Sequence, residues 1–214
     1  MILDPAVSLT DYAIAVEGVI LAALLLRAPK SAGRFWFVLF FTFIAIAALL
    51  GGTVHGFVPD EATHMYTILW GATLVSIGLV TVAAAMAAAN SGWGSTVRRV
   101  VATITIIGFV AYCNELLFVG QEFRMAIVVY LPATVFLLIS FIAAYFRVGR
   151  AAGREPTILV GAVGMLLTFA AAGVQQTSLA IGRLDHNAVY HVIQAVALVM
   201  IYFGARALRC RAAS

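Results

Sequence analysis

Residues 35–57 of the chain read FWFVLFFTFIAIAALLGGTVHGF, and this stretch decides the fold. It contains no Asp, Glu, Lys or Arg, and its length is close to the ~20 apolar residues that a helix needs to cross ~30 Å of hydrocarbon. Apolar and polar residues do not alternate along it, as they do in the strands of a membrane barrel. Because lipid offers the backbone no hydrogen bonds, the stretch is predicted to be a transmembrane α-helix.

The whole chain has the composition of a membrane protein. Hydrophobic residues make up 64% of it and charged residues only 10%, whereas a soluble domain is nearer half apolar and a quarter charged. A domain of this size has too much surface to hide that excess in a core. No basic stripe with interleaved aromatic residues is present, so the sequence argues against nucleic acid as a partner and favours membrane lipid.

Six further apolar runs surround the first one. We predict seven transmembrane helices at residues 9–26, 35–57, 65–89, 100–120, 125–146, 157–181 and 187–208. The connections between them are too short for a soluble domain. The fold is therefore predicted to be an all-α, seven-transmembrane helix bundle that forms one integral membrane domain over residues 1–214.

The basic residues predict the orientation of the bundle. Eleven of the thirteen Lys and Arg residues fall on one side of the predicted spans, and only Arg124 and Arg183 fall on the other. Cytoplasmic loops carry such an excess of Lys and Arg. We therefore expect the N-terminus outside, the C-terminus in the cytoplasm, and the chain in the plasma (inner) membrane.

Polar side chains gather toward the outer ends of the spans. Ionisable groups inside a span are costly, so they normally face the bundle interior and mark a site. Glu115 is the best single candidate, because it lies about 7 Å inside its span. Asp11 is assigned to the membrane interface. Polar groups from five helices predict one outer pocket, with these further candidate residues: Glu17, Asn114, Gln175, Gln176, Tyr190 and Gln194.

The histidines of this pocket suggest a metal. Histidine suits zinc, and a catalytic zinc site needs three protein ligands plus water. The candidate ligands are His55, His186 and His191. His186 and His191 are five residues apart, which on a regular helix sets them about 140° apart. Both can bind one metal only if His186 precedes the helix.

Two stretches carry a resemblance to a known family. Residues 51–55 read GGTVH and residues 186–194 read HNAVYHVIQ. A histidine near the end of the second helix and a histidine cluster opening the seventh resemble the seven-helix superfamily of alkaline ceramidases and adiponectin receptors. The resemblance implies a zinc ion that serves the hydrolysis of lipid amides, with His55 and His191 as ligands. Gly51 stands where that family usually has a serine, and Asn187 where it has a histidine paired with His191.

Three functions follow from these patterns. The first is a membrane hydrolase of a lipid amide or ester, in which zinc on the three histidines activates water and Glu115 is the general base. The second is a non-catalytic transporter, sensor or assembly subunit that binds a small polar ligand in the same pocket. The third is a haem protein with His55 and His191 as axial ligands. A retinal protein is excluded, because its Schiff base needs a lysine within a span and the only lysine is Lys30, in a predicted loop.

Overall fold

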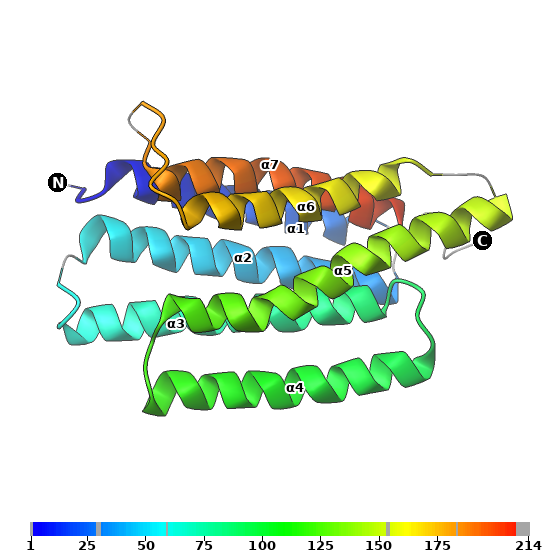
Figure 1. The fold of residues 1–214 in the computed structure, drawn as a ribbon, viewed down its shortest axis with the longest axis horizontal. Helices are drawn as coiled ribbons and strands as arrows, with labels where there is room; N and C mark the ends of the chain where they lie inside the picture. The colour runs from blue at the N-terminus through cyan, green and yellow to red at the C-terminus, as the bar shows by residue number, and fades with distance from the viewer. Residues whose placement is uncertain (1, 29–30, 59, 153–154, 183, 209–214) are drawn as a thin grey trace.

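The computed structural model of the protein describes residues 2–28, 31–58, 60–152, 155–182 and 184–208. These residues form seven α-helices (Figure 1): α1 (Pro5–Leu26), α2 (Ala32–Phe57), α3 (His64–Ala89), α4 (Ser95–Phe118), α5 (Phe123–Ala152), α6 (Thr157–Gln175) and α7 (His186–Ala207). All seven are long and apolar enough to cross a membrane. The prediction of seven such helices in an all-α fold is confirmed for the described part of the chain.

Two helix ends differ from the prediction in ways that affect the site. α1 begins at Pro5 rather than at residue 9, because the Asp4 side chain caps it by accepting a hydrogen bond from the Val7 backbone N–H. α6 ends at Gln175 rather than at residue 181. Beyond it the backbone turns at Gly182, whose φ is +63°, a region that favours glycine.

Six of the seven helices form a closed ring. α1 packs on α2, α2 on α3, α3 on α5, α5 on α6, α6 on α7, and α7 returns to α1. α4 lies outside this ring against α3, at the edge of the bundle in Figure 1. Only 11% of its span is buried, against 67% for α3. A side chain on α4 therefore has little access to the interior of the ring.

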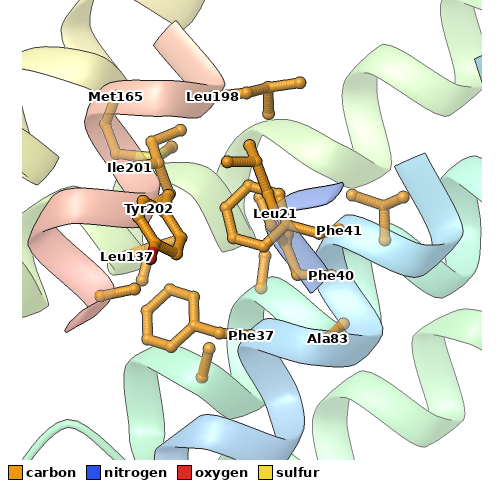
Figure 2. Close-up of a cluster of buried hydrophobic side chains, with 14 of the residues drawn as sticks. Leu21, Phe37, Phe40, Phe41, Ala83, Leu137, Met165, Leu198, Ile201 and Tyr202 are labelled. Carbon is orange, nitrogen blue, oxygen red and sulfur yellow. The ribbon is translucent and has the colours of Figure 1, made fainter. Parts of the chain in front are cut away.

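One half of the ring is solid. Four odd-numbered helices (α1, α3, α5 and α7) begin at the same end of the bundle, which we call the N-terminal end and which lies on the left in Figure 1. Toward the opposite end, large side chains from α1, α2, α5, α6 and α7 fill the interior and pack against Val80 and the alanines of α3. Figure 2 shows this aromatic plug, which includes Leu21, Phe37, Phe40, Phe41, Leu137, Met165, Ile201 and Tyr202. The plug separates the far end of the bundle from the interior of the ring toward the N-terminal end.

Small residues allow the ring helices to approach closely. On α6 and α7, a Cβ built on Gly204 would lie only 2.5 Å from the Cα of Gly161. Such contacts between glycines are a common way for membrane helices to pack. They bring α7, which carries Asn187, His191 and Gln194, close against α6.

Candidate functional site

The half of the ring toward the N-terminal end encloses a cavity of about 380 Å³. This volume lies at the small end of the roughly 300–1,000 Å³ that is usual for ligand pockets. All six ring helices line the cavity and α4 does not. Its lining is mostly apolar, but it includes an ionisable pair, described next, and the polar residues His55, Thr73, Thr168, Gln175, Asn187 and Gln194.

Asp11 of α1 and His191 of α7 form the polar centre of the cavity wall. His191 Nε2 lies 3.2 Å from Asp11 Oδ1, and both side chains are about nine-tenths buried. The other ring nitrogen, Nδ1, lies 3.0 Å from the Thr10 hydroxyl in a hydrogen bond. The Thr10 hydroxyl donates its own hydrogen to the Ala6 and Val7 carbonyls, each 2.9 Å away, so it accepts from Nδ1–H. Nε2 and the Asp11 carboxyl group then share one proton, and the pair carries no net charge. Both nitrogens of His191 therefore have protein partners.

The position of Asp11 follows from the local sequence of α1 and α2. Because α1 begins at Pro5, Asp11 lies about 9 Å inside the helix at 1.5 Å per residue. A Cβ built on Gly52 would lie 2.9 Å from Asp11 Cβ, and one built on Gly51 would lie 3.6 Å from Asp11 Oδ2. The two glycines thus leave the room on α2 that the Asp11 side chain occupies.

α7 supplies two further polar groups of the lining, Asn187 and Gln194. Asp185 caps the helix by accepting a hydrogen bond from the Ala188 backbone N–H at 2.8 Å. Asn187, one residue inside α7, lies 3.5 Å from Gln175 at the end of α6, amide to amide. Two turns after Asn187, Gln194 Nε2 donates to the Thr168 hydroxyl at 3.4 Å. These contacts tie α6 to α7 along the cavity wall.

His55 lines the cavity from α2, near the end of that helix. Its ring meets that of Trp70 edge to face, with 6.3 Å between the ring centroids. Trp70 in turn donates its indole N–H to the Gln121 carbonyl, 3.0 Å away in the connection between α4 and α5. Both rings line the cavity, so His55 contributes an imidazole held against an aromatic wall.

The structure brings together five of the residues that the sequence singled out. His55, Gln175, Tyr190, His191 and Gln194 all line the cavity. They come from α2, α6 and α7, which are neighbours of one another or of α1 in the ring. Depth within a span therefore predicted this part of the site.

The other candidates lie elsewhere. Asn114 and Glu115 lie on α4, outside the ring, and neither lines the cavity. They were grouped with the histidines because they lie at a similar depth in their span. Hydropathy does not indicate where around the bundle a helix lies, so it could not place α4 outside the ring. Gln176 follows the end of α6 and is exposed, because that helix stops before it. The expectation that α6 carries Gln176 into the pocket is corrected by this earlier end.

Glu17 and His186 also lie outside the cavity lining. Glu17 is seven residues after Thr10, so it lies on the same face of α1, about two turns deeper. Its Oε1 atom is buried without a hydrogen-bond partner among the described residues. His186 is the first residue of α7 and is half-buried.

The most important residue that sequence reasoning missed is Asp11. With α1 taken to begin at residue 9, Asp11 falls at the membrane interface and is read as a solvated group. Asp4 followed by Pro5 is a helix-start signal that places the beginning of α1 four residues earlier. That signal puts Asp11 inside the span and could have identified it. Nothing in the sequence pattern pointed to Thr10 or Trp70.

The residues present do not fit a zinc ion as they stand. Neither His186 nor Glu115 lines the cavity, and both ring nitrogens of His191 are engaged by Thr10 and Asp11. In the part of the chain that the structure describes, no group of three His, Cys, Asp or Glu side chains could hold a metal ion. The zinc hypothesis would need a rearrangement of the Asp11–His191 pair.

Comparison with known proteins gives one match. A family model described as a family of unknown function, DUF6962, matches residues 6–210 of the chain. No curated protein and no solved structure matches it. The matched residues include nearly all of the seven helices and every residue that lines the cavity.

Proposed function

We infer the function of this chain, which belongs to DUF6962, a family of unknown function, from its cavity. We propose that it is a membrane-embedded binding protein, acting as a sensor, transporter or assembly subunit, that holds a small molecule with a polar group. The observation that carries this proposal is a cavity of about 380 Å³ with the Asp11–His191 pair in its wall. A largely apolar cavity with a few convergent polar groups is the usual form of a ligand site.

The contacts of His191 support binding over metal-dependent hydrolysis. A catalytic zinc site needs three protein ligands and an open position. Here both ring nitrogens of His191 have protein partners. Glu115, the expected general base, lies on α4 and does not line the cavity. The resemblance to ceramidase-like hydrolases therefore stays a prediction about two short stretches.

The aromatic plug argues for binding rather than open conduction. It fills the ring interior with buried side chains such as Phe37 and Phe41, both at most 1% exposed. A ligand in the cavity would have to displace these rings to reach the other end of the bundle. In this conformation the aromatic plug closes the cavity toward the far end of the bundle. Such a closed cavity suits a receptor or the ligand-bound state of a transporter.

Native mass spectrometry of the chain released from lipid nanodiscs tests the proposal. We expect a co-purifying small-molecule adduct that is lost in Ala126→Phe, because Ala126 lines the cavity and is 2% exposed. Val128→Phe, on the same helix at a 58% exposed position, is the matched control and should keep the adduct. A wild-type chain without any adduct, or an adduct undiminished in Ala126→Phe, would count against binding in this cavity.

The direction of insertion is also part of the proposal. The excess of Lys and Arg on one side supports a cytoplasmic C-terminus, an outward-facing N-terminal end and residence in the plasma (inner) membrane. A reporter that works only in the cytoplasm, fused after Ser214, should be active. Activity of an exclusively extracytoplasmic reporter at the same position would reverse the orientation and the side from which the cavity is reached.

A further inference from the structure

The cavity changes character along its length. At 1.5 Å per residue from the helix ends at the N-terminal end, His55 lies about 3 Å deep and His191 about 8 Å deep. The deepest polar lining groups lie within about 14 Å on the same scale. Ile44, Ile77 and Val80 line the cavity at about 20 Å or more. The cavity is therefore polar near the N-terminal end and apolar above the aromatic plug.

Gln194 presents an unused hydrogen-bond acceptor at the boundary between the two parts. The Thr168 hydroxyl donates its hydrogen to the Gly164 carbonyl at 3.2 Å, so it can only accept from Gln194. That contact assigns Nε2 of Gln194 to Thr168 and leaves Oε1 without a partner among the residues that the structure describes. Gln194 is 93% buried, since only 7% of it is exposed, and it lines the cavity. A buried acceptor of this kind is costly unless a donor reaches it.

The charge of the lining favours an uncharged ligand. No Lys or Arg is among the described residues that line the cavity, and Asp11 is the only acid. Asp11 already has His191 at 3.2 Å, so the pair needs no counter-ion. An anionic or cationic head group would enter a low-dielectric site without a free partner of opposite charge, which is strongly unfavourable.

We propose that the ligand is a neutral single-chain amphiphile, with an alcohol or amide head near Gln194 and His191 and a hydrocarbon tail directed toward the aromatic plug. This inference rests on the proposed function, because it names the chemical class that the same cavity takes. The head supplies the O–H or N–H donor that Gln194 Oε1 lacks. The tail covers the apolar surface formed by Ile44, Ile77 and Val80.

Trp70 provides a reporter inside the cavity. The chain has three tryptophans, and the double change Trp36→Phe and Trp93→Phe leaves Trp70 as the only one. In phosphatidylcholine nanodiscs, 2-bromodecan-1-ol, whose bromine lies beside the head, should quench Trp70 with a saturable component above the linear quenching expected from partition into lipid, because Trp70 lines the cavity about 9 Å deep. Decan-1-ol and decanamide should compete with it. Decanoate and decylammonium should compete at least tenfold less well, and so should butan-1-ol, at equal mole fraction in the bilayer.

Substitutions test where head and tail lie. Ala48→Phe should abolish saturable quenching, because Ala48 lines the cavity about 14 Å deep, where the tail must pass, and is 8% exposed. Leu49→Phe, the next residue of the same helix and 52% exposed, should leave quenching unchanged. Gln194→Leu should weaken binding of decan-1-ol about fivefold to tenfold, the effect of one lost hydrogen bond to a buried group. If Ala48→Phe does not fold, Ile77→Phe narrows the apolar part of the cavity from α3, about 6 Å deeper.

The outcomes separate the two proposals. Equal competition by butan-1-ol, decanoate or decylammonium overturns the assignment of a neutral single-chain amphiphile and leaves the binding function standing. Saturable quenching that persists in both Ala48→Phe and Ile77→Phe overturns the placement of the tail. Absence of saturable quenching by the brominated alcohol, together with a wild-type chain that carries no adduct in native mass spectrometry, overturns the binding function itself.

Discussion

Replacing His191 with alanine should lower the free energy of unfolding by about 1–3 kcal/mol, the usual cost of leaving a buried polar group without its hydrogen-bond partner. The change leaves the Asp11 carboxylate in the cavity wall, where Asp11 is 6% exposed, and takes away its contact at 3.2 Å. Thermal unfolding in lipid nanodiscs measures the loss. His64→Ala is the control, because His64 is exposed at the start of α3.

A second substitution separates the lost pair from lost packing. If the cost of His191→Ala comes from the stranded carboxylate, adding Asp11→Asn should recover part of the stability. The double-mutant cycle then gives a coupling between positions 11 and 191 of the size seen for residues in direct contact. Equal melting temperatures for His191→Ala and His64→Ala, or purely additive effects in the cycle, would show that the pair does not form.

The second large effect is expected at the contact between α6 and α7. Gly204→Leu should destabilise the bundle by at least the ~1–3 kcal/mol typical of overpacking, because a Cβ at position 204 already lies 2.5 Å from Gly161 Cα. Backbone rather than a flexible side chain stands in the way, so the helices must move apart. The shift carries α7 away from α6, and so should also weaken the Gln194–Thr168 contact.

Gly173→Leu is the matched control for this change. It lies on α6 as well, but a Cβ there has nothing within 4 Å. We expect its thermal unfolding to stay close to that of the wild-type chain. Equal melting temperatures for Gly204→Leu and the Gly173→Leu control would contradict the close contact between α6 and α7.

Hydropathy predicted the helices because lipid imposes the same requirement on every span. The run at residues 35–57, for example, became α2 with an end at the predicted residue, Phe57. The end of α6 could not be read in this way. Residues 177–181 are largely apolar, yet the backbone leaves the helix there and turns at Gly182. Apolar composition alone does not distinguish a helix from a turn that packs on it.

The site was predicted in part, for a physical reason. Polar groups at the same depth, such as His55 and His191, do meet when their helices belong to the ring. Glu115 has a similar depth but lies on α4, which packs outside the ring against α3. The order of the helices around a bundle depends on which helices pack together. A single sequence indicates how deep a residue lies in its span, but not where around the bundle its helix lies. Asp11 was missed for a different reason, since its depth depended on recognising the cap at Asp4.

The hydrogen-bond role of Gln194 Oε1 could be assigned only from the three-dimensional structure. The sequence marks Gln194 as a polar residue one turn below His191. Its hydrogen-bond role depends on Thr168, a residue of another helix whose own hydrogen is already donated to Gly164. Because these contacts leave Gln194 Oε1 as an acceptor, they predict that the ligand carries a hydrogen-bond donor.

The most direct test of the central claim is the zinc content per chain, measured by elemental analysis in the same preparations used for thermal unfolding. The claim is that His191 is held by Asp11 and Thr10 as part of a small-molecule site. It predicts far less than one zinc per chain for protein purified without chelators, and no change in that value for His191→Ala, although the melting temperature falls. One zinc per wild-type chain that is lost in His191→Ala would contradict it and restore the hydrolase.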